Sequence, residues 1–477
     1  MPVSRSIFDD VSALGRAAGF DLCGMACVPE PGSAADYAEL RGFEPWVKEG
    51  RAGEMNYLKR EDDAGRLLRS SLRIAIPWAR SVIVCAANYN SSAPRSVDAV
   101  AVEDPGDASG AAHATGSTDA IEASDAAAAD SSGRGWIARY AWTGQRDPVA
   151  REDERLRPSD YHKVLLRRLK HVEAGLHAYA GDAAGSGGPL TDGPLQTRCY
   201  VDTGPVIERV YAKYAAIGWV GKNTCILNEQ LGSWLFLGVI VTSLEVDAAE
   251  GSDAENRDAE AFQVVGRSSG SAFAPLPDRC GSCTRCIDAC PTGALTEPYK
   301  MDASLCISYL TIEKRGEIPE PLRELMGRQV FGCDICQDVC PWNRRAPISS
   351  DANMQVREEL VNPPLEWLAN LDEAEFARIF YGSPVKRAGF NGLRRNVAIA
   401  MGNSGLKRFL PQLEQWRHSE DAVLADAASW SAGRIRRAGD ADVGDGRLPP
   451  FDQLDRAGSG SIDADPNAHV ARSAQAG

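Results

Sequence analysis

The spacing of apolar and polar residues along the chain predicts helices that alternate with strands. Residues 6–19 and 161–180 carry apolar side chains at helical spacing, as in a helix with one buried face, and 206–217 is a third predicted helix. Short runs rich in β-branched and aromatic residues predict strands over 81–89, 136–142, 199–202 and 234–244. This alternation favours an α/β layer sandwich over roughly residues 1–245.

The end of the chain has a different pattern. Ala-rich helical segments are predicted over 393–401, 406–416 and 421–435, and glycines interrupt the pattern at 402 and again at 433. This recurrence suggests a HEAT-like α-helical repeat over 346–436. Residues 437–477 are rich in Gly, Asp and Ala and predict a disordered tail. The whole chain is therefore predicted to be an α+β multidomain protein.

The formal net charge of −14 is confined to two segments. Residues 96–133 hold eight acids and no Lys or Arg, and residues 245–260 hold seven acids against one arginine. Both are poor in aromatic residues and cannot bury enough apolar surface to order themselves. We predict a disordered insertion over 96–133 and a disordered acidic insertion over 246–272. The rest of the chain is neutral overall, so net charge excludes no partner, nucleic acid included.

Eight of the thirteen cysteines fall in one module, predicted over 273–345. Its first block is Cys-x2-Cys-x2-Cys-x3-Cys-Pro from Cys280, the run with which bacterial ferredoxins hold iron–sulfur clusters. The second block, from Cys333, is one cysteine short of this run, and Cys306 can supply the missing ligand. Eight thiolates are enough for two [4Fe–4S] clusters, which would make the protein an electron carrier or a redox enzyme.

In such modules the last cysteine of each run ligates the other cluster. This rule assigns one cluster to Cys280, Cys283, Cys286 and Cys340 and the other to Cys290, Cys306, Cys333 and Cys336. Zinc is the alternative, because Cys-x2-Cys pairs are common in zinc sites. Zinc does not explain two Cys-Pro endings with a crossed partner.

The cellular location follows from the same thiolates, which must stay reduced, and this predicts a cytoplasmic protein. No N-terminal segment has the charged start and apolar run of a secretory signal. The most apolar stretch, Trp234 to Val241, is too short to cross a bilayer, so we expect no membrane association. We expect a monomer.

Several motifs resemble epoxyqueuosine reductases, in addition to the first cysteine block, Cys280 to Leu295. They are Val201-Asp-Thr-Gly-Pro205, Gly218-Trp-Val-Gly-Lys-Asn223, Cys306-Ile-Ser-Tyr-Leu310 and Phe331-Gly-Cys-Asp-Ile-Cys-Gln-Asp-Val-Cys-Pro-Trp-Asn343. The resemblance runs from about residue 6 to 436 and includes the spacing of all eight cysteines.

The resemblance implies a fold, a reaction and partners. An α/β domain would bind cobalamin (vitamin B12) beside a ferredoxin-like module with two [4Fe–4S] clusters, and the helical repeat would bind tRNA. The reaction would be the two-electron reduction of epoxyqueuosine to queuosine in tRNAs with a GUN anticodon, the last step of queuosine biosynthesis. An external low-potential electron donor would feed the clusters.

Asp202 matches the family's catalytic acid. Its role as proton donor requires a protonated carboxyl, which burial against cofactor and substrate would favour. Asp-Thr-Gly-Pro is also good turn chemistry, so a purely structural role is the alternative. By resemblance, the cobalamin contacts would be Arg69, Ala138, Asp202, Ile226, Leu237, Ile240, Ser308 and Asp334.

A basic run over 386–408 suits phosphate contacts, because it carries six cations and no acid. The predicted tRNA-binding residues are Lys314, Arg315, Lys386, Arg387, Arg394 and Arg395, and Lys407 and Arg408 complete the run. A merely solvated face is the alternative.

Two other functions fit parts of the sequence. A reductive dehalogenase would combine cobalamin with the same cluster module, but such enzymes typically carry a twin-arginine export signal and lack the helical repeat. A simple electron carrier would leave residues 1–272 unexplained. Cobalamin content and activity on epoxyqueuosine-containing tRNA distinguish the three.

Overall fold

The computed structural model describes residues 5–32, 37–99, 132–145, 156–186, 193–245 and 275–441 of the chain. The chain divides into two compact units, Met1–Ile435 and Arg436–Gly477, and the described part of the second is only the end of one helix. The first unit mixes helices and strands. The predicted insertion 246–272 and the predicted tail beyond residue 441 lie outside the described residues. No helix in the described ranges has the length and apolar character needed to span a bilayer.

A four-stranded sheet forms the centre of the N-terminal half. Its strands are β1 (Leu22–Cys27), β2 (Ser81–Asn88), β9 (Leu235–Thr242) and β6 (Thr197–Tyr200), in that order across the sheet. Alternating helices and strands usually indicate parallel strands, but all three pairings here are antiparallel. The first half is therefore an α+β layer, because the chain leaves β1 and enters β2 at the same end of the sheet, and does so again from β6 to β9.

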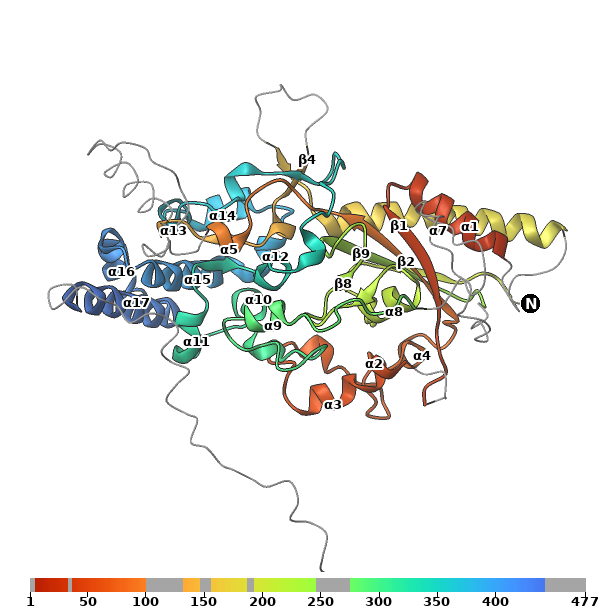
Figure 1. Ribbon diagram of the computed structural model, residues 1–477, viewed down its shortest axis with the longest axis horizontal. Helices are drawn as coiled ribbons and strands as arrows, with labels where there is room; N and C mark the ends of the chain where they lie inside the picture. Colours follow the sequence, from red (N-terminus) through yellow and green to blue (C-terminus); the bar gives the residue numbers. More distant parts are fainter. Residues whose placement is uncertain are drawn as a thin grey trace, which may run out of the picture. The chain divides into compact units, whose positions relative to one another are not determined.

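Helices cover both faces of this sheet (Figure 1). Against one face, α1 (Arg5–Ala17) and α7 (Tyr161–Ser186) pack on alternate residues of β2 and β9 such as Ile83 and Ile240. Against the other, α8 (Glu208–Tyr214), α4 (Leu72–Ala75) and α2 (Ala38–Arg41) pack on the intervening residues. The alternation follows from the strand period of two.

The cysteine module and the C-terminal helices share one hydrophobic core. It joins α10 (Ile307–Ile312), α15 (Gly389–Ser404) and α17 (Ala422–Ala441) to β10 (Gln329–Phe331). The strand β3 (Trp136–Ile137) pairs in parallel with β10 and adds Trp136 and Ile137 to this core. The three regions that the sequence analysis assigned to separate domains thus all contribute to one hydrophobic core.

The remaining elements are short. The helices are α3 (Phe43–Lys48), α5 (Ser96–Ala99), α9 (Arg285–Asp288), α11 (Glu320–Leu325), α12 (Ile335–Asp338), α13 (Leu365–Ala369), α14 (Glu373–Ile379) and α16 (Leu410–Trp416). The strands are β4 (Thr143–Gln145), β5 (Arg157–Pro158), β7 (Trp219–Val220), β8 (Ile226–Leu227) and β11 (Gln355–Val356). The 3-10 turns are η1 (Asn56–Leu58), η2 (Arg139–Ala141), η3 (Ala303–Leu305), η4 (Pro341–Asn343), η5 (Glu358–Leu360), η6 (Pro384–Ala388) and η7 (Lys407–Phe409).

Several sequence expectations are changed by tertiary contacts. The predicted strand over 136–142 ends at Ile137, because the backbone turns so that the Arg139 amide can reach the buried Asp334 carboxylate at 2.7 Å. The first residues of the predicted insertion form the helix α5, and Ser96 donates from both its amide and its hydroxyl to Asp338. Residues 100–131 of that insertion lie outside the described residues.

Candidate functional site

The eight module cysteines form two neighbourhoods, because thiols in each group raise the pKa of others close to them. Burial raises the pKa of Cys286, and the nearby Cys280 and Cys283 add to the effect. Burial likewise raises the pKa of Cys340 to about 11, with contributions from Cys280 and Cys286. These four thiols come from two places in the sequence, the 280–286 block and position 340, and the structure brings them together.

The second neighbourhood contains the other four thiols. Burial raises the pKa of Cys333, and Cys306 and then Cys290 push it further in the same direction. A hydrogen bond with Cys225 is the largest cause of the raised pKa of Cys336, and Cys333 and Cys306 also contribute. The thiols thus form two groups, with Cys225 beside the second, and the assignment of four ligands to each cluster stays a prediction. Within the described ranges, no three His, Cys, Asp or Glu side chains converge as a mononuclear metal site would require.

A segment of the N-terminal half supports these thiols, although the sequence analysis assigned it no role. Lys222 Nζ donates to the Gly281 carbonyl at 2.6 Å, and Asn223 Nδ2 donates to the Cys336 carbonyl at 3.3 Å. Both residues lie in the Gly-Lys-Asn motif between β7 and β8. Through these two hydrogen bonds, the Gly-Lys-Asn motif connects the N-terminal half to both cysteine blocks.

Asp202 follows β6 and adopts a left-handed backbone conformation, with φ of 53°. A non-glycine residue in this region is uncommon and often marks a functional turn. Its side chain is 44% exposed, so the carboxylate is accessible from outside the chain. Asp202 is therefore held in a defined turn and points away from the core.

Two side chains from the start of α7 hold the Asp202 carboxylate. The Tyr161 hydroxyl donates to Oδ2 at 2.5 Å, and His162 Nε2 lies 3.6 Å from the same oxygen. The Tyr161 ring is fixed by stacking on Phe236, with centroids 4.2 Å apart. On the far side of the imidazole, His162 Nδ1 lies 3.3 Å from Asp160 Oδ1. The order Asp160, His162, Asp202 forms a short polar chain that ends at the exposed carboxylate.

Glu208 is a second carboxyl near Asp202 that sequence reasoning missed. It opens α8, and its Oε1 atom is enclosed without a hydrogen-bond partner among the described residues. Burial, and then the neighbouring Asp202 carboxylate, raise the pKa of Glu208 to about 7. The sequence signal available was its position six residues after Asp202, just beyond the Val201–Pro205 motif.

The predicted cobalamin contacts do not all lie together. Ile226 and Leu237 belong to the hydrophobic cluster on the α8 face of the sheet, and Arg69 joins this side by donating to the Val206 carbonyl at 3.1 Å. Thr224 Oγ1 is buried nearby in sequence and, like Glu208 Oε1, has no partner among the described residues. This face therefore combines apolar contacts with unsatisfied polar atoms, which suits a cofactor with an apolar ring and polar edges.

Three predicted contacts are placed elsewhere. Ile240 is fully buried under α7, on the opposite face from Leu237, because residues three apart in a strand point to opposite sides. The Asp334 carboxylate is inside the core and accepts from the Trp136 indole at 3.0 Å. Ala138 is buried against Gly332. The side chains of these three residues are buried, so only their backbones are left for the predicted contacts with cobalamin, which stay predictions. Ser308 is half-buried on α10, two residues after Cys306.

The predicted tRNA residues also divide by exposure. Arg315, Lys386 and Arg387 are exposed, and Lys407 and Arg408 are exposed further along the run. Lys314 is ion-paired with Glu54, and Arg394 lies over the Phe390 and Trp416 rings, 5.2 and 5.1 Å from their centroids.

Arg395 has a structural position instead. It is only 3% exposed, and its guanidinium donates to the carbonyls of Leu310, Lys314 and Gly316 at 2.8 to 3.0 Å. Its donors are satisfied by the chain itself, so its side chain is not free for a phosphate. The tRNA prediction is wrong for this residue, because a basic run in sequence does not tell which members turn inward.

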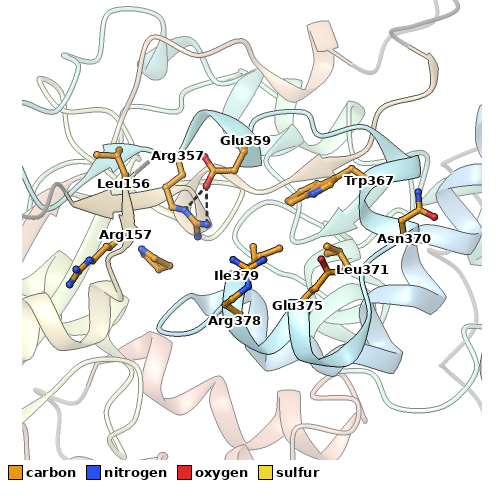
Figure 2. Close-up of a pocket in the computed structure, with 11 residues that line it drawn as sticks. Leu156, Arg157, Arg357, Glu359, Trp367, Asn370, Leu371, Glu375, Arg378 and Ile379 are labelled. Atoms are coloured by element: carbon orange, nitrogen blue, oxygen red, sulfur yellow. Dashed lines mark hydrogen bonds and ion pairs between the residues drawn. The ribbon is translucent and has the colours of Figure 1, made fainter. Parts of the chain in front are cut away.

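The structure also contains a cavity of about 390 Å³ that the sequence analysis did not anticipate (Figure 2). Trp367 and Ile379 line it together with the Arg357–Glu359 ion pair, whose atoms are 2.9 Å apart. None of the residues predicted for cofactor, catalysis or tRNA lines it. It is therefore separate from the site around Asp202.

Comparison with known proteins agrees with this geometry. A family model described as a 4Fe-4S double cluster binding domain matches residues 279–343, and one described as epoxyqueuosine reductase QueG matches residues 69–203. The epoxyqueuosine reductase of Xanthomonas campestris pv. campestris is 32% identical over 422 residues, which cover 88% of this chain and 94% of the relative. The chain belongs to the epoxyqueuosine reductase family. As a member of that family it is an oxidoreductase, and its eight-cysteine module binds two [4Fe–4S] clusters.

Solved epoxyqueuosine reductases share the fold. A crystal structure with an epoxyqueuosine-modified tRNA-Tyr stem loop has a TM-score of 0.63 at 24% identity, covering 90% of each chain. A Bacillus subtilis enzyme, with its catalytic aspartate loop swung out of the active site, has a TM-score of 0.62 at 24% identity and the same coverage. Epoxyqueuosine reductases are thus similar to this chain along most of its length.

Proposed function

We propose that this chain reduces the epoxide of epoxyqueuosine in tRNA to the alkene of queuosine, the final step of queuosine biosynthesis. The observation that carries the proposal is family membership along nearly the whole chain, 94% of the length of the Xanthomonas relative. The tRNA-bound structure of the same fold supports an anticodon-arm substrate. The dehalogenase alternative is not favoured, because the relative that covers 88% of this chain is an epoxyqueuosine reductase.

The cofactors follow from the chemistry. Removal of an epoxide oxygen as water consumes two electrons and two protons, and no protein side chain supplies electrons at the required potential. We propose cobalamin on the α8 face of the sheet, near Arg69, Thr224, Ile226 and Leu237, where bound cobalamin would supply a low-potential cobalt centre. Cys280, Cys283, Cys286 and Cys340 would hold one [4Fe–4S] cluster, and Cys290, Cys306, Cys333 and Cys336 the other.

Asp202 is the proposed proton donor. Its Oδ2 atom accepts the Tyr161 hydrogen bond, so the transferable proton belongs on Oδ1, the oxygen that Tyr161 leaves free for substrate. His162 Nε2 lies 3.6 Å from Oδ2 and helps to position the carboxyl, and Asp160 orients the imidazole ring. The swung-out aspartate loop of the Bacillus subtilis enzyme supports a mobile acid at this turn.

The remaining expectations are kept as proposals. The C-terminal helices α15 to α17 would form a HEAT-like platform for tRNA, with Arg315, Lys386, Arg387 and the partly covered Lys314 and Arg394 near phosphates. The protein would be a cytoplasmic monomer fed by an external low-potential donor. The hydrophobic core that α15 and α17 share supports the platform.

The deciding experiment uses anaerobically reconstituted protein and tRNA from cells that lack the enzyme. We expect about eight irons per chain, cobalamin absorbance and conversion of epoxyqueuosine to queuosine, measured by mass spectrometry of digested nucleosides. Iron at the expected level without conversion of the modified nucleoside would contradict the proposed reaction.

A further inference from the structure

Tyr381 is the most exposed large apolar side chain in the described part of the chain, at 68%. The backbone on both sides of it is fixed. Phe380 before it is fully buried, and after it Gly382 adopts a φ of 70° that directs the chain into η6. The Ser383 amide donates back to the Phe380 carbonyl at 3.0 Å. A well-defined turn therefore exposes the Tyr381 ring to solvent, and among the described residues the ring packs against no apolar core.

Two lysines from different elements flank the ring. Lys163 Nζ, on α7, is 5.8 Å from the ring centroid, and Lys386 Nζ, on η6, is 5.9 Å from it. Both lysines are exposed, and neither forms an ion pair with a carboxylate of the described residues. An aromatic ring between two lysines attracts a planar base that is joined to phosphates, because the base can stack on the ring and the phosphates can pair with the lysines.

The position of the ring connects it to the Asp202 site. Lys163 lies two residues after Tyr161, whose hydroxyl binds the Asp202 carboxylate. Lys386 precedes Arg387, which is close enough for its guanidinium to act on the Tyr161 and Tyr140 hydroxyls. Tyr381 therefore lies at the edge of the same site, between α7 and the basic run.

We propose that Tyr381, with Lys163 and Lys386, is a stacking platform for an unpaired base of the tRNA anticodon loop that lies next to the modified nucleotide. The inference depends on the proposed function, since it assumes that a tRNA loop enters the Asp202 site. An unpaired base stacks on an exposed aromatic ring without regard to its identity, and the two lysines neutralise the phosphates on either side. The platform holds the loop while the modified base reaches Asp202.

The experiment measures binding of an anticodon stem-loop to cluster- and cobalamin-loaded protein by fluorescence anisotropy at several salt concentrations. Tyr381→Ala should weaken binding by about five- to hundred-fold, whereas Tyr381→Phe, which keeps the ring, should bind like the parent. Tyr381→Ala should leave the salt dependence unchanged. Lys163→Ala and Lys386→Ala should each lower its slope by about 0.7, the value for one lost contact with single-stranded phosphate.

A second readout reports stacking directly. 2-Aminopurine placed in the loop beside the modified nucleotide should be quenched by the parent protein and by Tyr381→Phe, but not by Tyr381→Ala. Leu325→Ala, which truncates an exposed side chain on α11, is the matched control and should change neither binding nor quenching.

The outcomes separate this inference from the proposed function. If the parent protein converts epoxyqueuosine but Tyr381→Ala binds the stem-loop as tightly as the parent, the platform is refuted and the reaction stands. If the parent protein neither binds the stem-loop nor converts it, the proposed function fails first. At saturating tRNA, Tyr381→Ala should keep the parental kcat and show only a raised KM. A lowered kcat with unchanged KM would overturn a binding role.

Discussion

Replacement of Glu208 by glutamine should remove a pH-dependent loss of stability. Glu208 has an ordinary pKa of 4.5, and burial with the nearby Asp202 charge raises the pKa of Glu208 to about 7. A carboxyl with a raised pKa stabilises the fold only while it is protonated. This stability is fully present below pH 4.5 and is lost as the pH rises through about 7, because the folded state must then enclose an unpartnered charge.

The size of the effect follows from the shift. One pKa unit corresponds to about 1.4 kcal/mol, so the fold loses roughly 2 to 3 kcal/mol through this group between pH 5 and pH 8.5. Glutamine has nearly the same shape and no charge, so Glu208→Gln should escape this loss. The variant should be close to the parent at pH 5 and more stable at pH 8.5. In a unit of this size the difference amounts to a few degrees in melting temperature.

Thermal unfolding of the cluster-loaded protein, followed anaerobically at one scan rate and constant ionic strength, measures this difference. Glu317→Gln, a change at an exposed loop glutamate, is the control and should show no growing gap. If the gap between Glu208→Gln and the parent is the same at pH 5 and pH 8.5, Glu208 is not the buried acid that the structure indicates.

Four further changes test the rest of the site. Asp202→Asn should retain iron and cobalamin but lose about 100-fold or more in turnover, and near-parental rates would remove Asp202 from proton transfer. Tyr161→Phe should slow turnover by about ten-fold through the lost hydrogen bond to Oδ2, with substrate binding unchanged. Cys306→Ser should lower the iron content from about eight to about four per chain, and full iron would contradict its assignment as a ligand. Arg395→Ala should destabilise the fold by about 1 to 3 kcal/mol in denaturant titrations, because it leaves the buried Leu310 carbonyl without this donor and also removes the bonds to the more exposed Lys314 and Gly316 carbonyls. A weakened, salt-dependent tRNA affinity without loss of stability would restore its predicted surface role.

The cysteine groups could be predicted from sequence, because the local run of residues determines where each thiol points. The two long strands of the sheet were predicted for a similar reason, since β2 and β9 are continuous apolar runs. The strand β1 was missed, because Leu-Cys-Gly-Met-Ala-Cys is short and carries few β-branched or aromatic residues. The HEAT-like repeat stays a prediction.

The surroundings of Asp202 could not be predicted in the same way. Tyr161 and His162 reach it from a helix about 40 residues earlier, and no local pattern indicates that meeting. The inward turn of Arg395 is likewise a tertiary event. The opposite orientation of Leu237 and Ile240, by contrast, was readable from strand alternation.

The hydrophobic core shared by the cysteine module and the C-terminal helices links the loss of a cluster to the stability of those helices. Oxygen damage to a cluster would loosen Cys306 and α10, whose Leu310 and Ile307 belong to the same core as Val397 on α15. Loss of a cluster should thus lower the thermal stability of the C-terminal helices together with that of the cysteine module.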